Sequence, residues 1–210
     1  METIKGIDVS YYQGLNINWT SVSSTGVQFA YIKASEGQGR KEPNALVQSS
    51  GAKKAGLKIG YYHFSHIDAD SPVDEAIFFD NVLKGLPEAD LIPVLDIETN
   101  KSGLSPIQVT RWMEGFVQKM NQLGYPEVMI YSYTPFLNQY LVPPSTILAP
   151  TKLWIAQYTS APAPSIPKGY SKYDVWQYSN SGKINGIQGN VDVNVCYELP
   201  LKSISAIKGV

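Results

Sequence analysis

The chain has 210 residues, of which 43% are hydrophobic and 17% charged, and its formal net charge is −1. This length is enough to bury one sizeable core, and the near-zero charge argues against binding to nucleic acid or to an anionic membrane. Cys196 is the only cysteine, which excludes an internal disulfide bond. With only His63 and His66 to join it, a zinc site of the usual Cys/His type is not expected either.

Short apolar strands alternate with helical stretches up to about residue 130. This alternation predicts an α/β fold in which crossover helices connect parallel strands. Strands are predicted at Gly6–Val9, Phe29–Ala34, Lys58–Phe64, Leu91–Ile97, Val128–Tyr131, Leu153–Ala156, Asp174–Tyr178 and Val191–Val195. Helices are predicted at Asn44–Ala55, Pro72–Leu83 and Pro106–Leu123.

The predicted helices carry signals at both ends. Ser71 and Ser105 are each followed by a proline, which places a serine N-cap before a proline in the first turn. Gly56 and Gly124 follow helices as C′ residues. After about residue 140, prolines divide the chain into short strands and loops. We therefore expect one domain over residues 1–200 and a tail or linker stub over residues 201–210.

The segment Leu91–Glu98 predicts a buried strand that ends in two carboxylates. Alternate strand residues share a face, so Asp96 and Glu98 point the same way, with Cα atoms ~6.6 Å apart. A strand with this many apolar residues is typical of a sheet that is covered on both faces. In α/β barrels the active site lies at the carboxyl ends of such strands. Repulsion between the two acids raises the pKa of at least one, which suits a proton donor. The alternative is a solvated aspartate beside a glutamate that caps a helix or pairs with a lysine.

Three further acids, Asp8, Glu36 and Asp192, lie at the ends of other predicted strands or in the turns beside them. If the sheet closes into a barrel, these side chains converge on one mouth. An acidic pocket of this kind suits glycoside hydrolysis, or the binding of Mg²⁺ or Ca²⁺ by carboxylate oxygens. Neither a phosphate-binding glycine loop nor a G-x-S-x-G nucleophile elbow accompanies the acids.

The remaining reactive side chains have simpler interpretations. His63 lies on an aromatic strand, where a partly buried histidine with satisfied hydrogen bonds is the favoured interpretation. His66 is expected to be a loop residue without a role. Cys196 is expected to be a small core residue, because the sequence shows no partner that would activate its thiol. Lys33 is expected to pair with a carboxylate.

Seven motifs, in order along nearly the whole chain, resemble those of the family 25 glycoside hydrolases, which are lysozymes. Each motif is weak alone, and their shared order and spacing make the resemblance specific. The motifs are Gly6-Ile7-Asp8-Val9-Ser10 with Tyr12-Gln13-Gly14, Lys33-Ala34-Ser35-Glu36-Gly37, Gly60-Tyr61-Tyr62-His63-Phe64, Leu95-Asp96-Ile97-Glu98, Leu153-Trp154-Ile155-Ala156-Gln157-Tyr158, Trp176-Gln177-Tyr178-Ser179 and the acidic turn Gly186–Asn194.

The resemblance implies an irregular TIM-like (β/α)5(β)3 barrel that cleaves the β-1,4 bond between N-acetylmuramic acid and N-acetylglucosamine in peptidoglycan, without a cofactor or metal. It implies that Glu98 is the general acid and that Asp96, Asp8 and Asp192 complete the catalytic cluster. Candidate substrate-binding residues are Glu36, Tyr62, Tyr131, Trp154, Gln157 and Tyr178. A structural role is the alternative for each of the aromatic residues.

Three other functions stay open on the sequence alone. One is a chitinase-like glycosidase, the second is a catalytically silent glycan-binding barrel, and the third is a metal-dependent hydrolase. The partner expected for the family function is the peptidoglycan glycan strand, and we expect a monomer that binds neither nucleic acid nor membrane.

The N-terminus does not resemble a signal peptide, and no apolar stretch reaches the ~18 residues of a membrane span. These features predict a phage or prophage endolysin that stays in the host cytoplasm until membrane holes of the holin type release it. Export by a non-classical route is the alternative. A bacterial autolysin or an excised catalytic domain would have the same sequence features.

Overall fold

The computed structural model of the protein describes residues 2–203. Within this range eight strands close into a barrel, because β1 pairs with both β2 and β9. The strands from β1 to β8 run parallel around the ring, and β9 is antiparallel to both of its neighbours. The ring consists of β1 (Ile4–Val9), β2 (Val27–Glu36), β4 (Lys58–Phe64), β5 (Val94–Asp96), β6 (Met129–Tyr133), β7 (Lys152–Ala156), β8 (Val175–Gly182) and β9 (Val191–Cys196).

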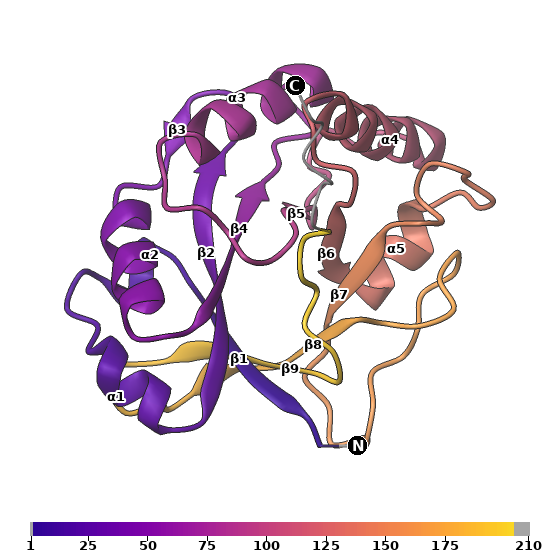
Figure 1. Ribbon diagram of the computed structural model, residues 1–210. Helices are drawn as coiled ribbons and strands as arrows, with labels where there is room; N and C mark the ends of the chain where they lie inside the picture. The colour runs from indigo at the N-terminus through magenta and orange to yellow at the C-terminus, as the bar shows by residue number, and fades with distance from the viewer. Residues whose placement is uncertain (1, 204–210) are drawn as a thin grey trace.

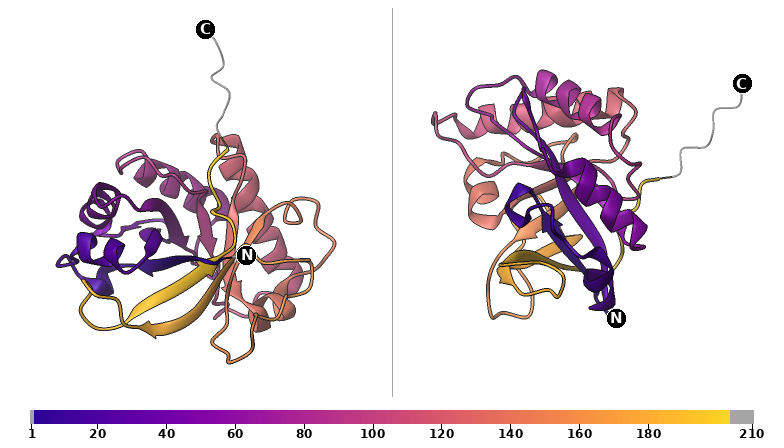
Figure 2. Two further views of the ribbon diagram at one scale, coloured as in Figure 1. Left: turned by 60° about the horizontal axis from the view of Figure 1, so that its bottom comes forward. Right: turned by 90° about the vertical axis from the view of Figure 1, so that its left-hand side faces the viewer.

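Helices cover the barrel on the side formed by the strands from β1 to β6. Each of the strands β1, β2, β4, β5 and β6 leads into one helix, and the β8–β9 side is left to strands and loops (Figure 1). This arrangement confirms the expected irregular (β/α)5(β)3 barrel. The helices are α1 (Trp19–Ser24), α2 (Ala45–Lys54), α3 (Pro72–Leu83), α4 (Pro106–Gln122) and α5 (Thr134–Tyr140); a 3-10 turn, η1 (Tyr11–Gln13), and a two-residue strand, β3 (Arg40–Lys41), complete the elements. Figure 2 shows β9 beside β1, where the ring closes, with β8 on the other side of β9.

Most predicted elements are present, and β4 and α3 have the predicted bounds. The predicted strand Leu91–Ile97 is wrong at its start, since β5 covers only Val94–Asp96. Pro93 has no N–H to give to a ladder, and the two residues before it pair with the C-terminal segment: Leu91 bridges Leu201, and Ile92 N–H donates to the Pro200 carbonyl.

The helices α1 and α5 were not predicted. Both are short, with six and seven residues, so neither shows a clear helical repeat in the sequence. α1 is also rich in serine and threonine, which are weak helix formers. It begins at the N-cap Asn18, whose Oδ1 accepts a hydrogen bond from Ser21 N at 3.0 Å.

The barrel interior is filled by large side chains packed against glycines. Phe29 and Tyr31 of β2 point inward with Trp154 of β7, and all three are almost completely buried. A Cβ atom on Gly6 would lie 2.2 Å from the Phe29 ring, and one on Gly60 would lie 2.3 Å from the Tyr31 ring. The aromatic rings therefore fit only because the facing strands carry no side chain at these two positions.

A second core lies between the barrel and its helices, and it contains a buried polar chain. His63 packs against Phe79 and Phe116, with ring centroids 5.3 and 5.5 Å away. Its Nδ1 lies 2.8 Å from Ser35 Oγ, and its Nε2 lies 2.7 Å from Glu75 Oε2. The histidine is fully buried with both nitrogens bonded, which confirms the sequence interpretation.

This buried pair predicts a pH-dependent stability. Burial raises the pKa of Glu75 to about 8 and lowers the pKa of His63 to about 3, so the folded pair holds one proton between these pH values. In the unfolded chain the same groups titrate near 4.5 and 6.5. The unfolded state thus holds more protons from pH 3 to 4.5, the same number up to 6.5, and fewer from 6.5 to 8. We therefore expect the pair's contribution to the free energy of unfolding to rise between pH 3 and 4.5 and to stay level up to pH 6.5. Between pH 6.5 and 8 it should fall by about 2 kcal/mol.

Urea unfolding at pH 5.5, 6.5 and 8 would test this contribution in the wild type and in Glu75→Gln. The variant retains a hydrogen-bonding side chain without a titrating carboxyl group, so the fall between pH 6.5 and 8 should disappear. Glu88→Gln, at a position 87% exposed, serves as the control. An equal fall in the wild type and Glu75→Gln would contradict the assignment.

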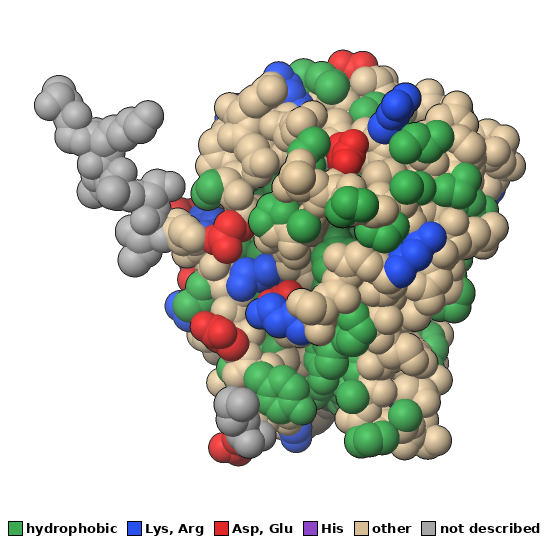
Figure 3. Space-filling model, turned by 90° about the vertical axis from the view of Figure 1, so that its right-hand side faces the viewer, with side chains coloured by type: hydrophobic (Ala, Val, Ile, Leu, Met, Phe, Trp, Pro, Cys, Tyr) green, Lys and Arg blue, Asp and Glu red, His purple; other side chains and the backbone are tan. Residues whose placement is uncertain are grey.

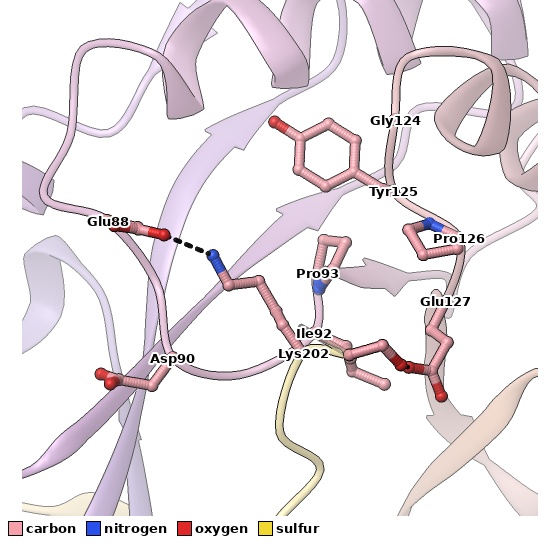
Figure 4. Close-up of a pocket in the computed structure, with 10 residues that line it drawn as sticks. Glu88, Asp90, Ile92, Pro93, Gly124, Tyr125, Pro126, Glu127 and Lys202 are labelled. Carbon is pink, nitrogen blue, oxygen red and sulfur yellow. Dashed lines mark hydrogen bonds and ion pairs between the residues drawn. The ribbon is translucent and has the colours of Figure 1, made fainter. Parts of the chain in front are cut away.

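At the amino ends of the strands, the C-terminal segment closes the barrel (Figure 4). Lys202 N–H donates to the Asp90 carbonyl, and Lys202 Nζ lies 3.4 Å from Glu88 Oε1. Ser203 Oγ donates to Glu127 Oε2. Residues 201–203 of the predicted tail therefore contact the barrel, and residues 204–210 lie outside the described range. A cavity of about 410 Å³ lies between this segment and the loops that precede β5 and β6.

The surface shows mixed charge. On the face in Figure 3, acidic, basic and apolar side chains alternate over the described residues without a large patch of one charge, as the net charge of −1 suggests. No helix within residues 2–203 has the length and hydrophobicity needed to cross a membrane.

Candidate active site

A pocket of about 310 Å³ opens at the carboxyl ends of the barrel strands. Alternation along the strands produces it: in β2 the inward positions run from Phe29 through Tyr31 to Lys33, and in β5 they run from Val94 to Asp96. The lower inward residues are apolar and buried, whereas those at the mouth are polar. The pocket is lined by Asp8, Ser10, Tyr12, Lys33, Tyr62, Phe64, Asp96, Glu98, Tyr131, Trp154, Tyr158, Gln177, Asn180 and Asp192.

Asp8, from the end of β1, is held by two side-chain amides. Its Oδ2 accepts hydrogen bonds from Gln177 Nε2 at 3.0 Å and from Asn194 Nδ2 at 2.8 Å. Asn194 Oδ1 in turn accepts from Trp154 Nε1 at 2.8 Å. These contacts join β1, β7, β8 and β9 and fix one oxygen of Asp8 at the mouth.

The amide of Gln177 also orients two phenols. Its Oε1 accepts hydrogen bonds from Tyr131 OH at 3.0 Å and from Tyr158 OH at 2.7 Å. Burial and the nearby carboxylates raise the pKa of both phenols, so they remain neutral donors. The hydrogen bonds of Gln177 therefore hold the rings of Tyr131 and Tyr158 in the wall of the pocket.

Asp96 ends β5, and Glu98 lies two residues further along the chain. The Asp96 carbonyl accepts hydrogen bonds from Ser65 N at 2.9 Å and Ser65 Oγ at 2.8 Å, which fixes the backbone at the end of the strand. Asp96 Oδ1 is buried and has no hydrogen-bond partner within residues 2–203. The Glu98 carbonyl accepts from Tyr133 OH at 3.2 Å, while its side chain lines the pocket.

The four carboxyl groups of the pocket all bind protons more tightly than usual. Burial raises the pKa of Asp96, and the neighbouring Glu98 raises it further. Burial likewise raises the pKa of Glu98, of Asp8 and of Asp192; Asp192 adds to the effect on Asp8. The ammonium group of Lys33 acts in the opposite direction on Asp96 and Glu98. The raised pKa values favour the protonated form of these carboxyl groups, which suits a site that must donate a proton.

The structure places seven of the ten predicted site residues in this pocket: the four acids with Tyr62, Tyr131 and Trp154. Glu36, Gln157 and Tyr178 do not line it. Glu36 forms ion pairs with Lys33 and Arg40 beside the mouth. Gln157 is used within its own loop, where Oε1 accepts from Ser165 N at 2.6 Å, and the Tyr178 ring packs against Trp176.

His66 and Cys196 lie outside the acid pocket. His66 has a structural partner, because its Nε2 lies 3.0 Å from Glu36 Oε1, so the expectation of no role was wrong. Cys196 is a buried core residue, as predicted, and burial raises the pKa of its thiol to about 12.

The larger cavity of Figure 4 offers less chemistry than the acid pocket. Each of its acids already has a partner: Glu88 binds Lys202, Glu127 binds Ser203, and Asp90 binds Lys58 Nζ at 3.2 Å. Within the described part of the chain, no group of three or more His, Cys, Asp or Glu side chains has the arrangement of a metal site.

The model of the family "Glycosyl hydrolases family 25" matches residues 7–187. The chain belongs to this family. It is therefore a glycoside hydrolase, and the resemblance carried by the seven sequence motifs is confirmed.

Relatives and solved structures agree with this assignment. The chain is 35% identical over 198 residues to Lysozyme M1 of Streptomyces globisporus, covering 91% of this chain and 67% of the relative. It is 35% identical over 191 residues to the autolytic lysozyme of Clostridium acetobutylicum, covering 91% of this chain and 55% of the relative. The crystal structure of a bacterial lysozyme from Streptomyces coelicolor matches with a TM-score of 0.83 and 32% identity, over 95% of this chain and 94% of that one.

Proposed function

We propose that this family 25 hydrolase is a lysozyme that cleaves the β-1,4 bond between N-acetylmuramic acid and N-acetylglucosamine in peptidoglycan. The observation that carries the proposal is the pairing of Asp96 and Glu98 in one buried pocket that is also lined by aromatic rings. The names of the two bacterial relatives, both lysozymes, support the substrate.

Glu98 is the general acid in this proposal. Glycosidic cleavage needs a protonated group at the leaving oxygen and negative charge near the oxocarbenium-like transition state. Burial raises the pKa of Glu98, which favours the protonated form that can donate to the leaving oxygen. Its position past the end of β5, in a loop held by Tyr133, brings the carboxyl group to the pocket where a glycosidic oxygen would lie.

The pKa of Asp96 is raised as well, so in this proposal the Asp96–Glu98 pair shares one proton. Glu98 donates that proton, and Asp96 then acts in its ionised form, either on the cation directly or through the substrate. We favour the second route, in which Asp96 orients the 2-acetamido group of the sugar while that group attacks C1. Asp96 Oδ1 supports this role, because it is buried at the mouth without a partner in the described chain and can accept the acetamido N–H. Substrate assistance of this kind is a known exception to the two-carboxylate scheme.

The other residues of the pocket position these two acids and the sugar. Asp8 accepts hydrogen bonds from the side-chain amides of Gln177 and Asn194, so its role in this proposal is to orient these side chains rather than to react. Tyr12 and Tyr158 are 78% and 52% exposed at the mouth, where a ring face can stack on a sugar.

The products of peptidoglycan digestion would test the proposal. Purified cell walls are digested, reduced with borohydride and analysed by mass spectrometry. Reduced muramic acid ends are expected, whereas reduced glucosamine ends would move the cut to the other glycosidic bond. Release of reducing sugar from chitin instead of cell walls would indicate a chitinase-like enzyme, and binding without cleavage would indicate a glycan-binding barrel. Activity should persist in EDTA, and its loss would indicate a metal-dependent hydrolase.

We also propose that the enzyme acts as a phage or prophage endolysin. A wall-cutting enzyme must be kept from the wall of the cell that makes it, and the cytoplasm provides that separation until membrane holes form. Expression in a bacterium with and without a hole-forming membrane protein would test this role. Lysis that requires the second protein is expected, whereas lysis and release without it would indicate an autolysin.

A further inference from the structure

Lys33 is the only lysine or arginine among the described residues that line the acid pocket. It occupies an inward-facing position near the carboxyl end of β2, and it pairs in register with Tyr62 of β4. Its side chain is 12% exposed, and its ammonium group lies 4.8 Å from the centre of the Phe64 ring, another residue of the pocket wall. A single, largely buried cation thus faces four carboxyl groups.

A second set of side chains holds this cation in place. Lys33 Nζ lies 2.8 Å from Glu36 Oε2. The same Glu36 oxygen lies 3.4 Å from Arg40 Nη1, and the other oxygen lies 3.0 Å from His66 Nε2. Glu36 is therefore fixed through both oxygens, and Lys33 has little freedom to turn toward Asp96 or Glu98.

The contacts of His66 continue into the core. Its backbone N–H donates to Glu75 Oε1 at 2.9 Å, and Glu75 Oε2 lies 2.7 Å from His63 Nε2. His63 in turn bonds Ser35, the residue before Glu36. The chain of polar contacts thus begins and ends on β2, and it ties the position of Lys33 to the buried core.

We propose that Lys33 is a positioning residue whose charge, restrained by Glu36, sets the protonation of the Asp96–Glu98 pair and hence the pH range of hydrolysis. The proposal rests on the lysozyme function argued above. Lys33 itself touches no reacting atom in this scheme, because its ammonium group is bound to Glu36.

Two charges next to the pair act in opposite directions. The positive charge of Lys33 lowers the pKa of both Asp96 and Glu98, and the negative charge of Glu36 raises the pKa of Asp96. Removing Lys33 should therefore move the active pH range upward, and removing the charge of Glu36 should move it downward. The other charged or titratable groups remain in every variant below. Arg40, Glu42, His63 and His66 lie around Lys33 and Glu36. The groups that face the Asp96–Glu98 pair are Asp8, Asp192, Tyr62, Tyr131, Tyr133 and Tyr158.

The test measures kcat/KM on solubilised peptidoglycan between pH 4 and 9 for Lys33→Met, Lys33→Arg and Glu36→Gln. Lys33→Met should shift both limbs of the profile upward by ~0.5–1 pH unit. Glu36→Gln should shift the limb that depends on Asp96 downward by a smaller amount. Lys33→Arg should leave the pH profile at its wild-type position, because arginine keeps the positive charge. Lys41→Met, which removes an exposed cation on β3, is the control and should leave the profile unchanged.

Carboxyl-carbon NMR titration of Asp96 and Glu98 in the same variants gives a readout that does not need turnover. Opposite shifts in Lys33→Met and Glu36→Gln support the proposal even if the wild type fails to cleave peptidoglycan, a result that would overturn only the lysozyme function. Equal or absent shifts in two folded variants would overturn the role of Lys33. A fall in kcat with an unmoved profile would likewise show a structural role only.

Discussion

Replacing Glu98 with glutamine is expected to lower kcat/KM on peptidoglycan by roughly 10²–10⁴-fold, the contribution of a general acid. Glutamine has nearly the same shape as glutamate but cannot donate a proton to the glycosidic oxygen. The fold should persist, since burial raises the pKa of Glu98 and the charged form is therefore the one that the folded protein disfavours. We expect the midpoint of thermal unfolding to stay at or above that of the wild type.

The measurement is the initial rate of wall clearing, together with mass spectrometry of the products and circular dichroism of the variant. Glu88→Gln makes the same chemical change at the opposite end of the barrel, where the side chain is 87% exposed, and should keep full activity. A folded Glu98→Gln protein with wild-type rates would show that another carboxyl group supplies the proton. Asp192 would then be the first alternative to examine, because burial also raises the pKa of that carboxyl group.

The sequence predicts the acidic pocket well, because the pattern responsible for it is local. Asp8 and Asp96 lie near the carboxyl ends of parallel strands, which the closure of the barrel brings together. Asp192 lies near the amino end of β9, and because β9 is antiparallel to β1 this end reaches the same mouth. Asp8 and Asp192 even pair directly across β1 and β9. The family resemblance added the order of the strands, which the strand pattern alone does not determine.

The amides of the pocket were missed for a physical reason. Gln177 and Asn194 have no distinctive spacing, and their role depends on contacts with Asp8 across more than 160 positions of sequence. Tyr158 was missed as a site residue in the same way, because its position depends on the Gln177 carbonyl oxygen. Only the three-dimensional register of β8 and β9 reveals these partners.

The misplacement of Glu36 has a different cause. Strict alternation from Phe29 and Lys33 would turn Ser35 inward and Glu36 outward. The pairing of β2 with β4 shifts between Lys33 and Ser35, and Ser35 turns outward to His63. Glu36 then lies beside the pocket, where it binds Lys33. An irregularity of this kind depends on the neighbouring strand and leaves no mark in the sequence of β2.

Replacing Asp96 with asparagine is the second change with a large expected effect, a loss of roughly 10²–10³-fold in kcat/KM. Asparagine keeps the size of the side chain and removes the negative charge that stabilises the acetamido group as it becomes positive. Because burial raises the pKa of Asp96, removing the ionisable group should leave stability unchanged or increase it. A rate loss with a retained unfolding midpoint would thus locate the effect in the reaction itself.

Glycan chemistry separates the two roles open to Asp96. If the 2-acetamido group attacks C1, de-N-acetylated glycan strands should be cleaved poorly by the wild type, and Asp96→Asn should lower that residual rate much less than it lowers the rate on acetylated strands. If Asp96 attacks directly, the variant should lose a similar factor on both substrates. Intact-protein mass spectrometry of enzyme quenched during turnover provides the independent check, since the favoured route forms no bond to the protein. A glycosyl adduct on Asp96 would establish the direct route, whereas its absence together with substrate-dependent losses would assign the nucleophile to the sugar.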